Sequence, residues 1–190
     1  MTGAADRTDL AAAPPAGWLL LVYRVPSEPT RLRAVVWRRL KGLGAIYLQN
    51  SAATLPAGPS AERALRLLRR EILDMGGAAS LLNCTALAGG TEIRAAFQAA
   101  RDDEYDEIVD KCQDFLAGLR KEYRADHFTY AELEENDEDL IKLRNWYAKI
   151  LARDVFGAPG RPACAEALQL CERALEDYAG WVYAGDSDGA

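Results

Sequence analysis

Between residues 18 and 87 the apolar side chains alternate between the short runs typical of β-strands and the 3.6-residue spacing of α-helices. The first run, WLLLVYRV, is rich in branched and aromatic residues and predicts a buried strand. The elements that follow are a helix, two strands, a helix and a strand, at residues 31–43, 45–49, 52–56, 61–75 and 79–87. This order, β-α-β-β-α-β, predicts a ferredoxin-like domain over residues 18–88.

A helical region follows this domain. After the glycine pair at residues 89–90, apolar residues at helical spacing predict a long helix over residues 92–124. Two more helices are predicted, one beginning at Asn136 and one after the GAPGRP turn at residues 157–162. The predicted fold class is therefore α+β, with an α-helical C-terminal region over residues 91–183.

The ends of the chain and its composition limit where it can work. Residues 1–17 lack the basic start and apolar middle of a signal peptide and are expected to be a disordered arm, and residues 184–190 a disordered tail. No apolar run approaches the roughly 20 residues that span a bilayer. The 4 cysteines form no C-x-x-C pair and are interpreted as reduced thiols. We therefore expect a cytoplasmic protein without membrane association.

Charge is distributed unevenly along the chain. Residues 1–98 hold 12 basic and 7 acidic residues, whereas residues 99–190 hold 11 and 22. Two interpretations of the basic first half stay open: an ordinary solvated helix surface, or a patch that follows the phosphates of nucleic acid. The candidate nucleic-acid-binding residues lie on the outward faces of the first two helices, and they are Arg31, Arg38, Lys41, Arg63, Arg66 and Arg70.

The predicted sheet has a second face that needs a cover. Two helices can cover only one face of a four-stranded sheet, and either the helical region or a second copy of the chain could cover the other. Because large exposed apolar faces are typical of interfaces, we expect a homodimer.

One position of the long helix interrupts its apolar face. The inward stripe runs from Ala100 to Ile108, and the position between them is Glu104. A buried carboxylate is costly unless it is paired, and Arg101 lies three residues earlier on the same face, with Tyr105 beside both. These residues form either a structural Arg–Glu pair packed against another helix or part of a ligand site.

His127 is the only histidine of the chain. We identify no Cys or carboxylate partner at suitable spacing beside it, so no metal site is predicted. The residue is either a surface residue, an axial haem ligand or a general base. The chain also lacks the motifs of nucleotide-binding and serine-hydrolase sites. The sequence therefore leaves enzymatic activity open and favours its absence.

Six carboxylates crowd residues 132–139. A calcium loop would need alternate oxygen ligands and a glycine at its sixth position, and neither occurs here. The sequence Asn136-Asp-Glu-Asp instead predicts a helix N-terminus, since Asn is a good N-cap and acidic residues suit the positive end of the helix dipole. Residues 132–135 are assigned to the preceding turn.

Three blocks of the sequence resemble the N-terminal domain of chromate-resistance regulators of the ChrB type. They are WLLLVYRVPSEPTRLRAVVWRRLKGLGAIYLQNS, ARDDEY and FTYAELEENDEDLIKLRNWYAKILARDVFGAP, at residues 18–51, 100–105 and 128–159. The first block is also similar to the ferredoxin-like central domain of phenylacetate-degradation repressors. The resemblance implies a bacterial cytoplasmic protein of transcription regulation linked to the chromate response, with DNA and an oxyanion effector as expected partners.

A second function class stays open beside the regulator. Arg101, Glu104, Tyr105 and His127 could line a pocket, which would make the chain a small enzyme or a ligand- or haem-binding protein. A Soret band in the visible spectrum of the purified protein would favour this class, whereas salt-sensitive DNA binding would favour the regulator.

Overall fold

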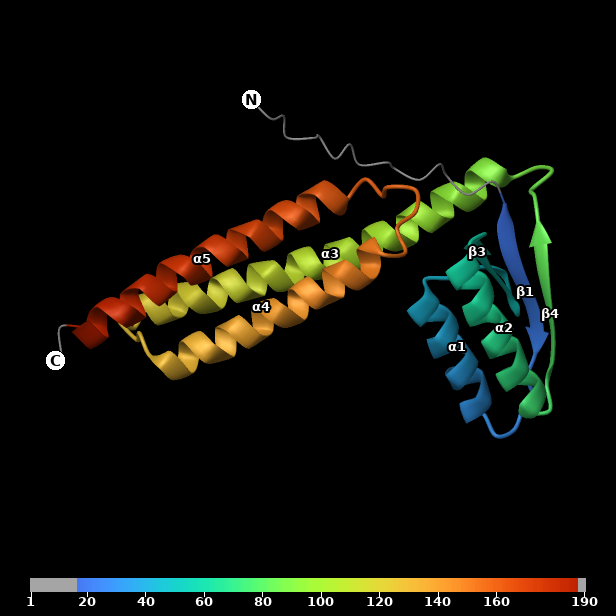
Figure 1. Cartoon of the computed structure of the whole chain (residues 1–190), viewed down its shortest axis with the longest axis horizontal. Helices are drawn as coiled ribbons and strands as arrows, with labels where there is room; N and C mark the ends of the chain where they lie inside the picture. The colour runs from blue at the N-terminus through green and yellow to red at the C-terminus, as the bar shows by residue number, and fades with distance from the viewer. Residues whose placement is uncertain (1–16, 188–190) are drawn as a thin grey trace, which may run out of the picture.

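The computed structural model describes residues 17–187 and places a sheet with two short helices at one end of a bundle of three long helices (Figure 1). The α+β class is confirmed, and the first six elements follow one another in the predicted order. The elements are β1 (Trp18–Arg24), α1 (Arg31–Leu43), β2 (Ile46–Gln49), β3 (Ala52–Pro56), α2 (Pro59–Asp74), β4 (Ala78–Cys84), α3 (Gly90–Arg124), α4 (Tyr130–Leu151) and α5 (Arg161–Ser187).

The structure leaves the outermost residues at both ends of the chain undescribed. Residues 1–16 of the predicted arm lie outside the described residues, as do residues 188–190 of the predicted tail. Helix α5 continues to Ser187, past the predicted start of the tail at residue 184. None of the helices within residues 17–187 combines the length and the apolar character needed to cross a membrane.

The four strands form one antiparallel sheet in the order β2-β3-β1-β4. Leu19 and Leu21 of β1 are buried, and because side chains alternate along a strand, they point to the same face of the sheet. On that face they pack with apolar residues of α1 and α2, which lie side by side in Figure 1. The helical residues of this first core are Val36, Leu40, Leu65, Leu68 and Ile72.

Helix α3 contacts the sheet where β1 begins. The ring of Phe97 lies 6.3 Å from the ring of Trp18, and Phe156 lies 5.6 Å from Phe97 and 5.7 Å from Trp18. Phe97 is only 1% exposed and belongs to the core of the sheet, although it stands on a helix of the bundle. The first turns of α3 therefore belong to both parts of the molecule.

The three long helices enclose a second core. It is built from one face of each of α3, α4 and α5, including Ile108, Leu143 and Tyr178. Cys164 and Cys171 are fully buried in it. Burial raises the pKa of the Cys164 thiol to about 11. These thiols therefore stay protonated and pack as small apolar side chains.

The start of α4 corrects the sequence prediction. The helix begins at Tyr130, and the N-cap is Thr129, whose side-chain oxygen accepts a hydrogen bond of 3.3 Å from the backbone N–H of Glu132. Asn136, the predicted cap, lies in the helix and donates its side-chain amide to the carbonyl oxygen of Glu132 at 2.7 Å. The acidic residues at 132–139 therefore all lie inside the helix, along its first half.

Candidate functional site

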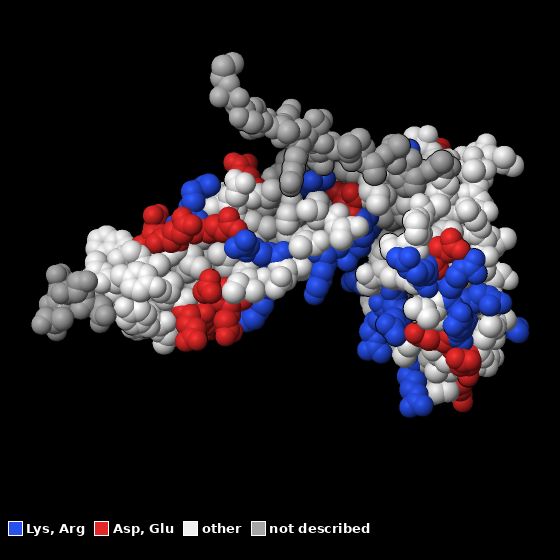
Figure 2. All heavy atoms as spheres, in the orientation of Figure 1, with Lys and Arg blue, Asp and Glu red and all other residues white. Residues whose placement is uncertain are grey.

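The outward surface of α1 and α2 is rich in basic side chains, and we call it the basic face. Helix α1 holds no acidic residue, and α2 adds three, Glu62, Glu71 and Asp74. Figure 2 shows Lys and Arg gathered over these helices, whereas the visible side of the bundle carries patches of Asp and Glu together with Lys and Arg. The basic face comprises Arg31, Arg33, Arg38, Arg39, Lys41, Arg63, Arg66, Arg69 and Arg70, all of them exposed.

Some of these cations already have partners. The Arg39 guanidinium lies 3.0 Å from the Glu71 carboxylate and so joins α1 to α2, and Arg66 pairs with Glu62 one helical turn away. The ammonium of Lys41 lies 5.4 Å from the centre of the Trp37 ring. Within residues 17–187, no carboxylate forms an ion pair with the remaining cations, which are Arg31, Arg33, Arg38, Arg63, Arg69 and Arg70.

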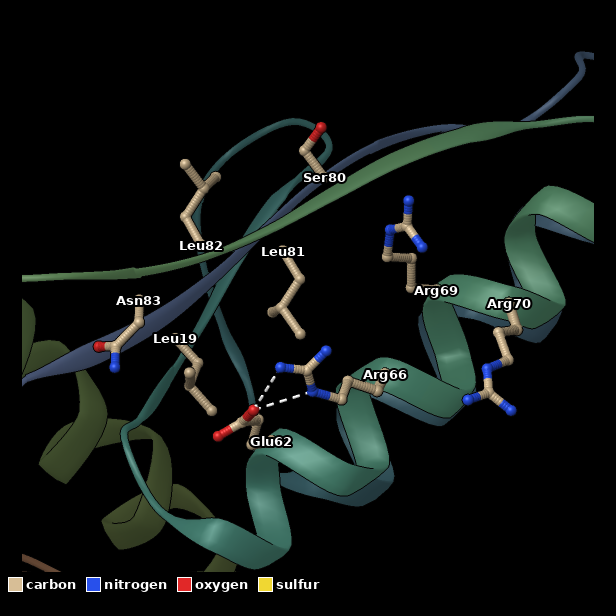
Figure 3. A pocket seen from close by; sticks show the side chains of 9 residues that line it. All are labelled: Leu19, Glu62, Arg66, Arg69, Arg70, Ser80, Leu81, Leu82 and Asn83. Carbon is tan, nitrogen blue, oxygen red and sulfur yellow. Dashed lines mark hydrogen bonds and ion pairs between the residues drawn. The ribbon is translucent and has the colours of Figure 1, made fainter.

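A groove of about 680 Å³ runs between α2 and the edge strand β4. Three arginines of the basic face, Arg66, Arg69 and Arg70, line it in successive turns of the helix (Figure 3). The Nε of Arg69 donates a hydrogen bond of 3.0 Å to the carbonyl oxygen of Ala79 on β4. The opposite wall is built from β4 residues, including Ser80 and Asn83. Glu62 also lines the groove and is paired with Arg66, so Arg69 and Arg70 are the arginines of the groove that form no ion pair within the described residues.

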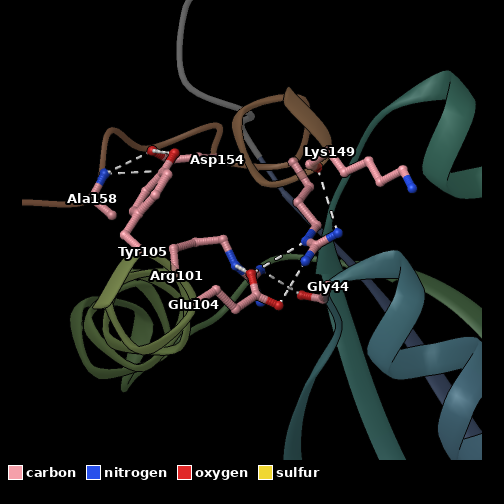
Figure 4. A network of polar contacts seen from close by, with 8 residues as sticks. Gly44, Arg101, Glu104, Tyr105, Lys149, Asp154 and Ala158 are labelled. Atoms are coloured by element: carbon pink, nitrogen blue, oxygen red, sulfur yellow. Dashed lines mark hydrogen bonds and ion pairs between the residues drawn. The ribbon is translucent and has the colours of Figure 1, made fainter. Parts of the chain in front are cut away.

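The second candidate site surrounds Glu104 of α3 (Figure 4). Its carboxylate accepts a bond of 2.7 Å from Nε of Arg101, as the sequence predicts. It also accepts two bonds from Arg153, of 2.7 Å from Nη2 and 3.3 Å from Nε. Arg101 donates further, through Nη1, to the carbonyl oxygen of Gly44 at 2.8 Å. Arg101 is 3% exposed and Glu104 15%, so the arginine is the more buried member of the pair.

Gly44 is part of this site because of its backbone. It ends α1 in the left-handed conformation, with φ of 76°, which favours glycine. A Cβ atom at this position would lie 2.5 Å from Cδ of Arg153 and 2.8 Å from Nη1 of Arg101. The glycine thus allows the two guanidinium groups to approach the end of α1, and the network joins the sheet to the bundle.

Tyr105 takes part in a neighbouring contact. Its hydroxyl donates to Oδ2 of Asp154 at 3.1 Å, and Asp154 also accepts from the backbone N–H of Ala158 at 3.0 Å. Burial, and then the nearby Asp154 carboxylate, raise the pKa of the Tyr105 hydroxyl well above its ordinary value. Asp154 therefore fixes both the tyrosine and the loop that leads to α5. No local spacing predicts this contact, because the two residues are 49 positions apart.

The four residues proposed for a ligand pocket do not come together. Arg101, Glu104 and Tyr105 are neighbours, but His127 lies beyond the far end of α3, about 35 Å away at 1.5 Å per residue. That part of the pocket prediction is wrong, since a straight helix separates the residues. No buried side-chain N or O atom of the described residues is left without a hydrogen-bond partner. We interpret the Glu104 network as a structural connection between the two cores.

His127 itself has two carboxylates beside it, which corrects the sequence analysis. Its Nδ1 lies 2.8 Å from Oε2 of Glu122, and the carboxylate of Glu132 completes a group of three whose ligand atoms lie within 4.8 Å of one another. Both glutamates are five residues from His127, one on each side. Residues five positions apart do not share a face of a single helix. The turn between α3 and α4 is what brings the three side chains together.

Comparison with known proteins identifies the family. The family model described as Protein ChrB, N-terminal, matches residues 33–188, most of the chain. Protein ChrB of Cupriavidus metallidurans is 33% identical over 100 residues. That alignment covers 52% of this chain and 30% of the relative, so the chain matches less than a third of that protein's length. The chain belongs to the ChrB family and corresponds to its N-terminal part.

Proposed function

We propose that this chain is a regulatory module linked to chromate resistance that binds the DNA backbone weakly through the basic face. Its sheet is assigned to the ferredoxin-like class, which the strand order β2-β3-β1-β4 supports. The family membership supports the regulatory role, and the arrangement of α1 and α2 supports the contact with DNA.

A single observation carries the proposal. Two adjacent helices present nine basic side chains on one surface, and seven of them form no ion pair within the described residues. Ordinary solvated helices balance their charges with carboxylates three or four residues away, as Arg66 does with Glu62. Helix α1 contains no carboxylate at all. The excess positive charge is therefore available to phosphates.

The rest of the molecule limits the affinity. Residues 99–190 hold 22 acidic and 11 basic residues, so the bundle repels DNA at long range. Salt screens charges beyond about 10 Å at 0.1 M, so the basic face acts only at short distance. We expect dissociation constants of about 1 µM at low salt and a steep loss of binding as salt increases.

Fluorescence anisotropy with a duplex from the chain's own promoter, at two salt concentrations, tests the proposal. Replacing Arg66→Gln and Arg70→Gln together should weaken binding and reduce the slope of log K against log salt by roughly 1–2. Arg120→Gln with Arg173→Gln is the matched control, because it removes two exposed arginines from the bundle. Equal binding curves for wild type and the Arg66/Arg70 variant would reject the basic face as a DNA site.

An oxyanion effector would use the same chemistry. Chromate carries negative oxygens that guanidinium groups bind as they bind phosphate. The groove lined by Arg66, Arg69 and Arg70 is the place we assign to it. Chromate should then displace the duplex in the anisotropy experiment, whereas chloride at equal ionic strength should displace less. Equal displacement by the two salts would leave only general screening and contradict an effector site in the groove.

We also propose a homodimer formed through the open face of the sheet. Leu20 lies opposite Leu82 in the register of β1 and β4, on the face away from α1 and α2. On this face Val22 is 44% and Leu82 46% exposed, and both are large apolar side chains. Light scattering on the purified protein should give the mass of two chains at micromolar concentration. Replacing Val22→Lys and Leu82→Lys should restore the mass of one chain, and a single-chain mass for wild type would contradict the proposal.

A further inference from the structure

We propose that Glu122, His127 and Glu132 form a binding site for a divalent first-row transition-metal ion at the turn between α3 and α4. One ligand atom from each residue lies within 4.8 Å of the other two. The three side chains come from the last turn of α3, from the connecting loop and from the first turn of α4. The site stands apart from the basic face and does not depend on DNA binding.

The end of α3 places His127 beside Glu122. Asp126 adopts a left-handed conformation with φ of 52°, and the backbone N–H of His127 bonds back to the carbonyl oxygen of Glu122 at 3.1 Å. The N–H of Asp126 bonds to the carbonyl oxygen of Tyr123 at 3.4 Å. These two bonds are the Schellman pattern, which reverses the chain at a helix end. The backbone therefore holds the imidazole and the Glu122 carboxylate side by side.

The start of α4 places the third ligand. Thr129 caps the helix through its bond to the N–H of Glu132, which makes Glu132 the third residue of the first turn. The backbone carbonyl oxygen of His127 accepts a bond of 2.8 Å from the hydroxyl of Tyr178 on α5. A helix end, a helix start and a contact from the third helix thus fix the three residues before any ion binds.

The donor set selects the class of ion. One imidazole nitrogen and carboxylate oxygens are ligands of Zn²⁺, Mn²⁺ and related ions, with metal–ligand distances of about 2.0–2.2 Å. Two ligands at right angles around such an ion are about 2.9 Å apart. The 2.8 Å between Nδ1 of His127 and Oε2 of Glu122 is therefore already close to a coordination geometry. Three protein ligands leave positions for water or for an exogenous anion.

Charge and access also favour a cation. The His127–Glu122 contact alone would satisfy an imidazole, yet the structure brings a second carboxylate to the same point. Two carboxylates around one imidazole leave negative charge at the turn. The His127 side chain is 51% exposed, so an ion can enter from solvent.

Titration calorimetry with Zn²⁺ and with Mn²⁺ tests the site. Wild type should bind one ion per chain, and His127→Asn or Glu132→Gln should each weaken binding at least about 10-fold. Glu135→Gln is the matched control, because it removes one exposed carboxylate from the same helix and should leave the affinity unchanged. Circular dichroism of each variant checks that the helices are retained.

A second measurement separates this site from the thiols. Co²⁺ bound by imidazole and carboxylates should give no thiolate charge-transfer band, and the Cys84→Ser variant, which removes the most accessible thiol, should bind like wild type. The proposal is overturned if wild type binds neither Zn²⁺ nor Mn²⁺. It is equally overturned if the His127 and Glu132 variants bind as wild type does, or if the Co²⁺ spectrum shows thiolate ligation.

Discussion

The sheet unit, residues 18–84, and the helical bundle of α3, α4 and α5 solve the problem of burying apolar surface in different ways. The sheet unit joins strands that are distant in sequence and covers them with two helices on one face. The bundle packs three long helices, and its core continues along most of their length. Each part has its own hydrophobic cluster, and α3 supplies residues to both.

Their surfaces differ as much as their cores. The helices of the sheet unit are basic (Figure 2), whereas the bundle holds more acidic than basic residues and carries the Glu122, His127 and Glu132 cluster. The two parts therefore present surfaces of opposite net charge. The comparison also shows where the parts depend on each other, because Phe97 and the Glu104 network are the contacts that join them.

The largest expected effect comes from the shared helix. Phe97→Ala removes a ring that is 1% exposed and contacts Trp18 and Phe156, so it should lower the free energy of unfolding by about 3–5 kcal/mol. Urea unfolding followed through tryptophan fluorescence measures the loss. Phe115→Ala, on the same helix but in the bundle core, is the control. If the parts unfold separately, each variant lowers its own transition, and a loss under about 1 kcal/mol for Phe97→Ala would contradict its place in the sheet core.

The next largest effect tests the connection around Glu104. Glu104→Ala leaves the Arg101 guanidinium buried without its carboxylate and should cost about 3 kcal/mol. Arg153 is 20% exposed and can turn to solvent, so it adds little to this loss. Arg101→Met combined with Glu104→Leu should cost less than Glu104→Ala alone, because no charge is then stranded. A thermal melt that Glu104→Ala does not change would disprove the connection.

Alkaline pH should weaken the bundle more than the sheet unit. Burial raises the pKa of Cys164 from its ordinary 9.0 to about 11, so the unfolded thiol ionises first. This contribution is fully present below pH 9 and is lost as the pH rises toward 11. Between pH 8 and pH 10, Cys164 should account for a loss of about 1 kcal/mol. Cys164→Ala should remove that part of the pH dependence, and an unchanged decline in the variant would refute the assignment.

A smaller effect distinguishes the two candidate caps of α4. Thr129→Ala removes the hydrogen bond to the N–H of Glu132 and should cost about 1 kcal/mol. Asn136→Ala, the matched control, replaces a residue inside the helix with a better helix former and should leave stability nearly unchanged. Urea unfolding of both variants measures the difference. A larger loss of stability for Asn136→Ala than for Thr129→Ala would show that Asn136 is the N-cap, as the sequence predicts.

The sequence predicted what depends on local spacing. The order of the first six elements follows from apolar periodicity, and the Arg101–Glu104 pair follows from a spacing of three on one helix face. The start of α4 was missed because both Thr129 and Asn136 can cap a helix, and only the tertiary structure shows which one ends the loop.

The partners that the sequence missed come from distant positions. Arg153 reaches Glu104 across 49 residues, and Gly44 reaches Arg101 across 57, so no periodicity connects them. Glu122 and Glu132 were visible at five residues on each side of His127. A spacing of five residues does not bring side chains together on one helix. The three side chains meet only because the chain turns between α3 and α4.

The uninterrupted length of α3 has a mechanical consequence. Its 35 residues extend over about 50 Å, with the sheet at one end and the turn before α4 at the other (Figure 1). Roughly 40 Å of rigid helix separates Phe97 from Arg124, so a tilt of about 5° at Phe97 would move the far end by about 3.5 Å. Because α3 is packed against α4 and α5 over most of its length, the three residues around His127 would move together as one body. A small rotation of the bundle against the sheet would therefore carry the whole turn between α3 and α4 over several ångströms without changing the distances within the cluster.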